Sequence, residues 1–244
     1  MSEFKNVVIT GAGSGIGQAL SLGFASDGYR VVGLGRTNSS LQDTQERSQS
    51  PNFSFKVVDV ANDEIVNRVF SDIASEIGTV DVLINNAAVY PRDYFLDQSA
   101  KEWTQAILIN ICGVANCCRA VLPQMLERNA GRIINIGSLA DINPIPASSA
   151  YSVSKAGLHS LTRALSAEID RGRYPNVLIN ELNPGANKTR MSASGQEPAN
   201  VYPFAKQLVD LPAGGPTGRM FLDGREILPG DGLKARIKHL LFSR

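Results

Sequence analysis

The sequence lacks several features that mark other classes of protein. It has no long basic block, and its 24 Lys and Arg residues against 23 Asp and Glu give a formal net charge of +1. This balance disfavours nucleic acid or an anionic membrane as a partner. The N-terminus has no basic region followed by an apolar run, and no uninterrupted apolar stretch reaches membrane-spanning length. These absences predict a cytoplasmic protein whose partner is a small-molecule substrate.

Cysteine and histidine are also scarce. The three cysteines, Cys112, Cys117 and Cys118, are clustered, odd in number and not paired with histidine at metal-ligand spacing. The two histidines, His159 and His239, are far apart in the chain. The sequence therefore predicts no metal site, and the cysteines are interpreted as small apolar residues of a helix.

Short apolar segments alternate with segments of helical periodicity along the 244 residues, of which 43% are hydrophobic. The predicted strands are residues 6–10, 30–35, 53–59, 80–84, 132–136 and 177–182. Helices are predicted between them, and the polar stretch 36–52 is either a loop or a solvated helix. This alternation predicts an α/β fold, a single domain with a doubly wound parallel sheet and helices on both faces.

A glycine-rich turn, residues 10–17, lies between the first strand and the first helix. Free amide donors and the positive end of the helix can hold a pyrophosphate there, and glycines let the backbone approach it. The common pattern G-x-G-x-x-G is not met, because Ile16 stands where the last glycine is expected. The turn still predicts nucleotide binding.

Arg36 follows the second predicted strand, where dinucleotide folds usually carry an acid that binds the ribose hydroxyls of NAD. A guanidinium can instead pair with a 2′-phosphate through two hydrogen bonds. Arg36 therefore favours NADP(H), with NAD(H) as the alternative. The simpler interpretation, a solvated loop arginine, stays open.

Tyr151 and Lys155 are four residues apart at the start of a predicted helix, so their side chains share one helical face. A lysine there can stabilise a tyrosinate, which makes the tyrosine a candidate proton donor. Such a short pattern is also common by accident, as a half-buried tyrosine beside a solvated lysine.

The wider sequence resembles the short-chain dehydrogenase/reductase family. The turn resembles the family's Thr-Gly-x-x-x-Gly-x-Gly through Thr10, Gly11, Gly15 and Gly17. The segment 85–88 is similar to its Asn-Asn-Ala-Gly, with Ala88 in place of the final glycine. The resemblance implies a Rossmann-type fold whose cofactor-binding part is about 1–140 and whose catalytic and substrate part is about 141–244.

The resemblance also implies site residues. In the implied catalytic set Tyr151 is the proton donor, Lys155 assists it, Ser138 orients the substrate and Asn110 holds a relay water. The implied cofactor-binding residues are Gly11, Ser14, Gly15, Ile16, Gly17, Arg36, Asp59, Val60, Asn86, Ala87, Ala88, Tyr151, Lys155, Pro184, Gly185 and Thr189.

The expected activity is hydride transfer between NADP(H) and a carbonyl or alcohol substrate. Residues 215–224 look like the last strand of carbonyl reductase branches of the family, which favours ketone or aldehyde reduction. Two alternatives are an NADP(H)-binding sensor or scaffold with little turnover, and an NAD-dependent alcohol dehydrogenase.

Some segments depart from the family pattern. The lid after Thr189 is short, which suggests an open pocket, and Asn187 replaces a usually apolar residue. No large insertion separates Ser138 from Tyr151, so a homodimer or homotetramer is expected. The tail, residues 234–244, has an apolar helical face that is expected to pack on its own or a neighbouring subunit.

Overall fold

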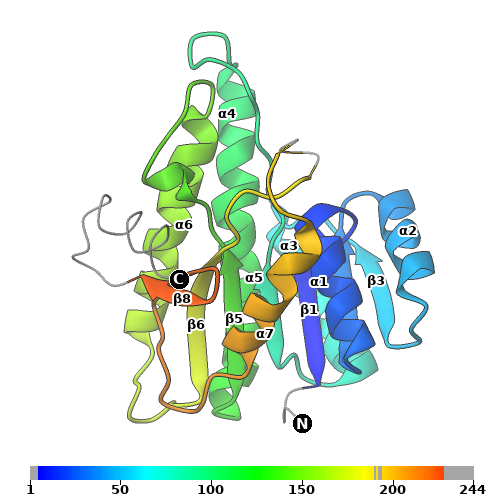
Figure 1. Cartoon of the computed structure of the whole chain (residues 1–244). Helices are drawn as coiled ribbons and strands as arrows, with labels where there is room; N and C mark the ends of the chain where they lie inside the picture. Colours follow the sequence, from blue (N-terminus) through cyan, green and yellow to red (C-terminus); the bar gives the residue numbers. More distant parts are fainter. Residues whose placement is uncertain (1–4, 190, 192–193, 228–244) are drawn as a thin grey trace.

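A computed structural model describes residues 5–189, 191 and 194–227 of the chain. Within them one sheet has the strand order β3-β2-β1-β4-β5-β6-β7-β8, parallel up to β7 and antiparallel at β8 (Figure 1). The strands are β1 Asn6–Thr10, β2 Arg30–Gly35, β3 Phe53–Val57, β4 Val82–Asn85, β5 Gly131–Ile136, β6 Val177–Asn183, β7 Met220–Leu222 and β8 Arg225–Ile227. The predicted doubly wound, Rossmann-type parallel sheet is confirmed.

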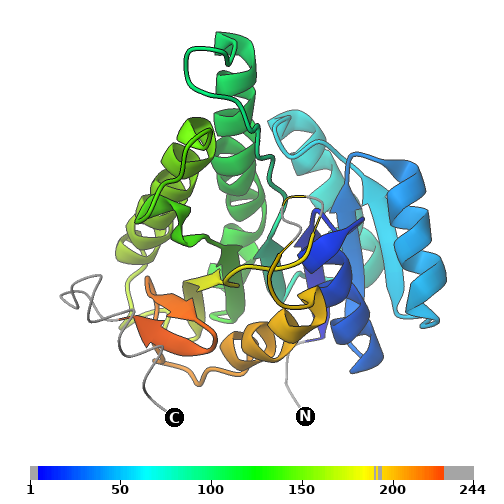
Figure 2. The same cartoon turned by 45° about the horizontal axis from the view of Figure 1, so that its top comes forward.

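Helices cover both faces of the sheet (Figures 1 and 2). They are α1 Gly15–Ser26, α2 Asn38–Ser48, α3 Asp63–Ile77, α4 Ala100–Ile107, α5 Gly113–Glu127, α6 Ser149–Glu168 and α7 Tyr202–Val209. A π-helical turn, η1 Leu108–Cys112, joins α4 to α5, and short 3₁₀ helices are η2 Leu139–Asp141 and η3 Pro198–Val201. The open choice for residues 36–52 is decided by α2, which is followed by the C-cap residue Gln49 at φ 46°.

Two hydrophobic cores result, because successive side chains of a strand point to opposite faces. On one face Val7 packs in the same cluster as Phe24 of α1 and Leu208 of α7. On the other face Val8 belongs to the cluster that contains Leu158 of α6 and residues of α3 and α5. Each fully buried aliphatic side chain contributes about 1.5–3 kcal/mol. The two cores fix the strand ends against the helices that follow them.

The order of strands reverses beside β1, which pairs with β2 on one side and with β4 on the other. Loops at the carboxyl ends of such strands diverge and leave a crevice for a ligand. The loops that follow β1, β4, β5 and β6 all carry residues of the predicted site.

The prediction for the end of the chain was incomplete. Instead of one strand over 215–224, the structure has a hairpin of β7 and β8, joined by Asp223 and Gly224 at φ 47° and 77°. Asp-Gly is a strong hairpin signal because both positions need positive φ, but no hairpin was predicted at these residues. β3 also ends at Val57, short of the predicted Asp59. The tail 234–244 and His239 lie outside the described residues.

The continuous helix from Ala100 to Glu127 is long and apolar enough, by length and composition, to cross a membrane. Its residues Val114, Cys117 and Cys118 are buried in the core that faces α3 and α6. Burial raises the pKa of the Cys118 thiol to about 12. A position in the protein core explains the apolar composition of this helix, and burial disfavours the reactive thiolate form of Cys117 and Cys118.

Candidate active site

A cavity of about 680 Å³ opens at the carboxyl ends of the central strands. Its volume is in the range of small-molecule and cofactor sites. Among the residues named from the sequence, Gly11, Ser14, Gly15, Ile16, Arg36, Asp59, Val60, Asn86, Ala87, Ala88, Ser138, Tyr151, Lys155, Pro184, Gly185 and Thr189 line it. Gly17 and Asn110 do not. Segments far apart in the sequence therefore meet at one cavity.

The glycine turn forms the first wall. Gly11 and Gly15 have φ of 68° and 55°, which disfavours any residue with a side chain. Ser14 precedes α1 but makes no side-chain cap hydrogen bond, so its hydroxyl does not occupy the first amides of the helix. Gly17 lies behind this wall, where an added Cβ would overlap the Gly11 carbonyl oxygen. The turn exposes backbone donors to the cavity.

The wall beyond β2 carries Arg36, Thr37 and Ser40. Arg36 is exposed, with no hydrogen bond or ion pair to another described residue, so its guanidinium is available to an anion. The two hydroxyl residues were missed in the sequence, where they appear as ordinary turn and helix-start residues. Across from them, the Asp59 carboxylate accepts a hydrogen bond of 3.0 Å from the Ala61 amide. The Asp59 side chain thus stabilises a turn and also lines the cavity.

Asn86 ties the β4 loop to β1. Its Nδ2 donates to the Thr10 carbonyl at 3.0 Å, and the amides of Asn86 and Ala87 each donate to Thr10 Oγ1 at 2.9 Å. Behind them, Asn85 Nδ2 donates to Asn135 Oδ1 at 2.9 Å. These partly or fully buried hydrogen bonds fix the segment 85–88 to β1 and β5.

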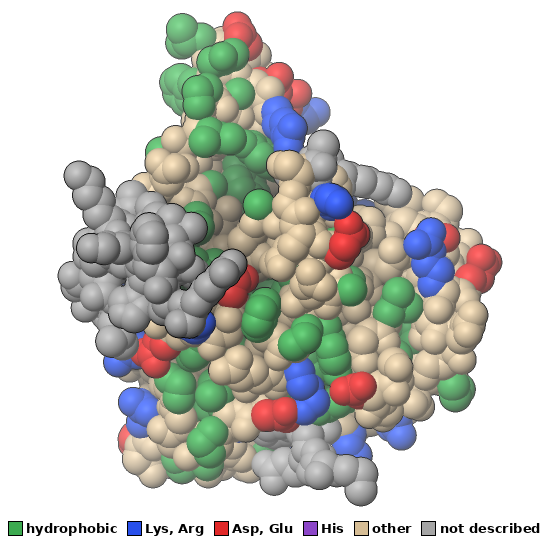
Figure 3. Space-filling view, viewed as in Figure 1, with side chains coloured by type: hydrophobic (Ala, Val, Ile, Leu, Met, Phe, Trp, Pro, Cys, Tyr) green, Lys and Arg blue, Asp and Glu red, His purple; other side chains and the backbone are tan. Residues whose placement is uncertain are grey.

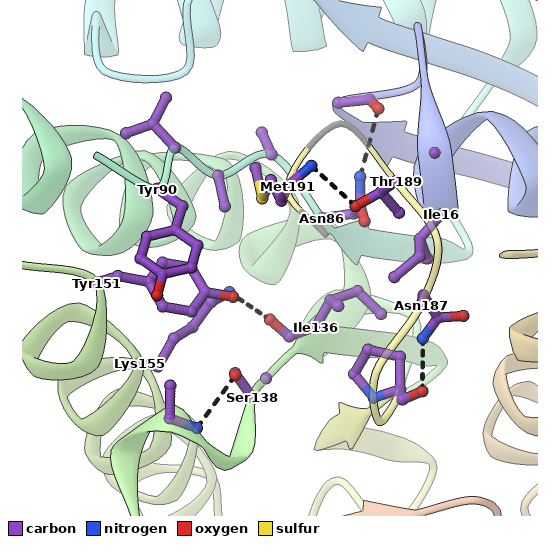
Figure 4. A pocket seen from close by; sticks show the side chains of 18 of the residues that line it. Ile16, Asn86, Tyr90, Ile136, Ser138, Tyr151, Lys155, Asn187, Thr189 and Met191 are labelled. Carbon is purple, nitrogen blue, oxygen red and sulfur yellow. Dashed lines mark hydrogen bonds between the residues drawn. The ribbon is translucent and has the colours of Figure 1, made fainter. Parts of the chain in front are cut away.

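Tyr151 and Lys155 project from the first turns of α6 into the cavity (Figure 4). Lys155 is 4% exposed, and its Nζ donates to the Ile136 carbonyl at 2.7 Å and lies 5.6 Å from the centre of the Tyr151 ring. Ser138 follows β5, and its Oγ accepts from the Ala140 amide at 3.2 Å, which leaves the hydroxyl proton free to donate. The three side chains come together at one end of the cavity.

Asn110 is buried in the π turn, and its side chain does not reach the cavity wall. Its Oδ1 accepts from the Val89 amide at 2.8 Å, and its Nδ2 donates to the Val89 carbonyl and to Ser154 Oγ at 2.9 Å. The side chain therefore fixes the loop after β4 against α6. Its predicted part in a water relay stays a prediction.

Asn187 is 5% exposed, and its Nδ2 donates to the Pro184 carbonyl at 2.7 Å. The polar residue thus braces the Pro184–Gly185 turn from inside, and the fold accommodates it. Gln196 closes the same loop, because its amide donates to the Ala186 carbonyl at 2.9 Å. The loop then enters η3 directly, so the described part of the lid is short.

The end of the cavity beyond Tyr151 and Ser138 has mostly apolar walls, with Asn143 as a polar residue on the loop after β5, and no sequence motif identified these residues. The apolar residues are Tyr90, Leu139, Ile142, Ile145, Met191, Leu222 and Ile227. Figure 3 shows hydrophobic side chains around the hollow below the projecting helices. Apart from Lys155, no Asp, Glu, Lys or Arg among the described residues lines this end. The apolar residues come from three loops and from the two strands of the β7–β8 hairpin, so no single stretch of the sequence contains them all.

A buried acid lies behind the β5 loop. Glu181 of β6 is 1% exposed, and its Oε2 is 2.9 Å from His159 Nδ1 of α6. A Cβ at Gly137 would overlap its other oxygen, so glycine is required before Ser138. Burial raises the pKa of Glu181, and the hydrogen bond to Glu181 raises the pKa of His159.

The cavity suits a dinucleotide in several independent respects. The glycine turn and the uncapped start of α1 offer amides to a pyrophosphate, and Arg36 and Asp59 stand where an adenosine end would lie. The apolar end beyond Tyr151 leaves space for a second, smaller molecule. A small substrate and a nucleotide could thus meet beside the Tyr151 hydroxyl.

Comparisons with known proteins agree with this geometry. A family model described as short chain dehydrogenase matches residues 5–200. The chain is 32% identical over 190 residues to an uncharacterized oxidoreductase of Staphylococcus aureus (strain USA300), covering 78% of this chain and 81% of the relative. It is 36% identical over 196 residues to the uncharacterized oxidoreductase YvrD of Bacillus subtilis (strain 168), covering 80% and 73%.

Solved structures are similar over almost the whole chain. A short chain dehydrogenase/reductase family protein has 27% identity and a TM-score of 0.80, with 91% of this chain and 97% of that one covered. A tyrosine-to-phenylalanine variant of ElxO with NADPH bound has 25% identity and a TM-score of 0.81, with 92% and 98% covered. Levodione reductase, at 24% identity and a TM-score of 0.82, shows the same fold.

Proposed function

The chain belongs to the short-chain dehydrogenase/reductase family of oxidoreductases, and from that premise we propose that it reduces an uncharged carbonyl compound with NADPH. The observation that carries the proposal is the convergence of Tyr151, Lys155 and Ser138 at the apolar end of a cavity whose other end is a glycine turn. When bound, the nicotinamide supplies the hydride. The residues of the chain supply position, a proton and charge stabilisation.

Under the proposal, Ser138 and Tyr151 donate hydrogen bonds to the substrate carbonyl oxygen. Tyr151 then gives its proton to that oxygen as negative charge develops on it. The buried Lys155 ammonium stabilises the phenolate that remains. A variant that lacks only the Tyr151 hydroxyl therefore tests this proton transfer separately from the binding of NADPH.

The test of the catalytic assignment is Tyr151→Phe. Loss of a general acid lowers kcat by roughly 10²–10⁴-fold, whereas the fold and the Kd for NADPH should stay unchanged. Tyr94→Phe is the matched control, because Tyr94 is 64% exposed and does not line the cavity. Near-normal turnover in Tyr151→Phe contradicts the assignment. Tight NADPH binding without turnover of any ketone, aldehyde or quinone by the parent protein favours a sensor or scaffold instead.

The apolar end of the cavity supports an uncharged substrate, since an unpaired carboxylate would be desolvated there. Acetophenone and phenylglyoxylate form a matched pair, because both carry an aryl ketone and only the second is charged. We expect a kcat/KM at least about 10-fold higher for acetophenone, which corresponds to about 1.4 kcal/mol. Equal values for the two ketones contradict the proposed substrate class.

The exposed guanidinium of Arg36 supports NADP(H) over NAD(H), and the NADPH held by the ElxO variant agrees with that choice. Loss of a charge-assisted contact of about 2 kcal/mol should raise the Kd for NADPH roughly 30-fold in Arg36→Ala, with little change for NADH. Arg47→Ala is the control, because Arg47 lies on α2 and pairs with Asp43 at 3.0 Å. An unchanged Kd for NADPH in Arg36→Ala, or tighter binding of NADH by the parent, indicates an NAD-dependent alcohol dehydrogenase.

The proposal also includes a single domain in which residues of about 1–140 hold most of the cofactor. Pro184, Gly185 and Thr189 would complete the nicotinamide end from the second part of the chain. A homodimer or homotetramer and a cytoplasmic location stay predictions from the sequence.

A further inference from the structure

Tyr90 lies against Tyr151, and no sequence motif identified it. It is half-buried in the loop after β4, and its ring stacks on the Tyr151 ring with centroids 4.4 Å apart and planes 19° apart (Figure 4). Stacked aromatic pairs contribute about 0.5–1.5 kcal/mol beyond the area they bury. One face of the Tyr151 ring is thus covered by protein.

The loop holds Tyr90 in place from its N-terminal side. Asn110 binds both backbone groups of the preceding residue, Val89, at 2.8 and 2.9 Å. Because Asn110 also donates to Ser154 on the helix that carries Tyr151, the two tyrosines are anchored to one framework. The backbone of this loop cannot shift without breaking those hydrogen bonds.

Arg92 holds Tyr90 from the other direction. Its guanidinium carbon lies 5.1 Å from the centre of the Tyr90 ring, and its Nη2 donates to the Met191 carbonyl. Met191 lines the cavity just after Thr189. A contiguous set of contacts therefore runs from the loop after Thr189 through Arg92 and Tyr90 to Tyr151.

We infer that Tyr90 is a positioning residue for Tyr151 and that Arg92 links it to the loop after Thr189. The stacked ring fills the space into which the Tyr151 side chain would swing about χ1, so the hydroxyl is held at the end of the cavity where Ser138 lies before a substrate arrives. This inference rests on the proposed function, in which Tyr151 is the proton donor. Preorganisation of this kind acts on the chemical step, because a misplacement of about 1 Å can cost 10²-fold in rate.

The kinetic test is Tyr90→Leu against Tyr90→Phe, with acetophenone and NADPH. We expect Tyr90→Leu to lower kcat roughly 10-fold, with a smaller change in KM because Tyr90 also lines the apolar end of the cavity, and with the Kd for NADPH nearly unchanged. Tyr90→Phe should restore kcat because it keeps the stack. Tyr94→Leu is the control on the same loop, at 64% exposure. Arg92→Ala should lower kcat less, and its effect should not add to that of Tyr90→Leu. Equal kcat in Tyr90→Leu and Tyr94→Leu, or no recovery in Tyr90→Phe, overturns the inference.

A second measurement does not depend on turnover. Nitration of tyrosine by tetranitromethane, followed by peptide mass spectrometry, reports how accessible the Tyr151 ring is. With Tyr94 as internal reference, Tyr151 should be nitrated several-fold faster in Tyr90→Leu than in the parent or in Tyr90→Phe. An unchanged rate overturns the inference. A faster rate in a protein without carbonyl reductase activity contradicts the proposed function and leaves the positioning contact supported.

Discussion

Replacement of Glu181 by glutamine tests the electrostatics of the wall behind the cavity. Glu181 is 1% exposed, one carboxylate oxygen is 2.9 Å from His159 Nδ1, and the other has no hydrogen-bond partner among the described residues. Glutamine keeps the shape and can keep the hydrogen bond to His159, while it removes the charge. The substitution therefore isolates the cost of burying a carboxylate.

The sign follows from the direction of both pKa shifts. Burial raises the pKa of Glu181 above 4.5, and the hydrogen bond to Glu181 raises the pKa of His159 above 6.5. A group whose folded pKa is raised stabilises the fold below its unfolded pKa and loses that contribution as pH rises through the folded value. Both groups therefore make the parent less stable as pH rises above these ordinary values. In Glu181→Gln, the part of this loss of stability that comes from ionisation of Glu181 is absent.

The magnitude comes from the charge, because a glutamine amide leaves a neutral atom without a partner at the same position. A buried polar group left without a partner costs about 1–3 kcal/mol, and a charged group costs more, so removal of the charge should recover an amount of this order. The His159 side chain is 31% exposed, so solvent screens its interaction with Glu181, and we use the lower half of that range. We expect Glu181→Gln to gain about 1–2 kcal/mol on the parent as pH rises from the ordinary pKa of a glutamate toward the raised pKa of Glu181. For a chain of this length that is a relative Tm shift of about 2–8 °C.

Thermal unfolding followed by circular dichroism, with urea unfolding at the same pH values, measures the effect. Glu168→Gln is the control, because Glu168 is an exposed acid on the same helix as His159 and should show no comparable trend. A stability difference that is constant with pH, or that moves in favour of the parent as pH rises, refutes the reasoning. That result would mean that the fold stabilises Glu181 as a carboxylate.

Three further substitutions separate binding from stability. Gly17→Ala would place a Cβ on the Gly11 carbonyl oxygen, so calorimetric titration should show weaker NADPH binding together with a lower Tm. Asp81→Ala removes an acceptor of two backbone amides and one arginine, and urea unfolding should show a loss of about 2 kcal/mol with an unchanged Kd for NADPH. Asn110→Ala frees both backbone groups of Val89, so it should lose a similar amount, about 2 kcal/mol, and lower kcat as well. An unchanged kcat in a folded Asn110→Ala protein contradicts its role in anchoring the loop.

Local patterns predicted the parallel sheet, and the resemblance to the short-chain dehydrogenase/reductase family implied most of the residues that line the cavity. The period of the apolar residues locates β1 to β6, and the chain order of the strand ends then brings Arg36, Ser138 and Tyr151 to one edge. Such inferences succeed because they depend on the residues next to each strand. The hairpin at Asp223–Gly224 also depends on two adjacent residues, so it could have been predicted from the sequence.

Contacts between distant segments could not be predicted in this way. Tyr90 and Tyr151 stack across 61 residues of chain, and the pairing of His159 with Glu181 depends on how α6 packs on β6. In the sequence these residues look like an ordinary aromatic, a half-buried histidine and a strand glutamate. Their roles depend on how the helices and strands pack against one another. The sequence pattern predicts where these elements lie along the chain but not how they are oriented in the fold.

The π turn at Leu108–Cys112 lies within the long helix from Ala100 to Glu127 and changes its winding locally. Here the Gly113 amide donates to the Leu108 carbonyl, five residues back, so the turn holds one residue more than an α-helical turn allows. Deletion of one residue there would restore regular α-helical winding and leave α4 in the same orientation relative to α5, because the π turn takes up its extra residue within one turn. Ala106, which is fully buried, would keep its place in the packing. In an alignment of relatives, a one-residue gap in this segment should therefore leave the apolar face of α4 unchanged.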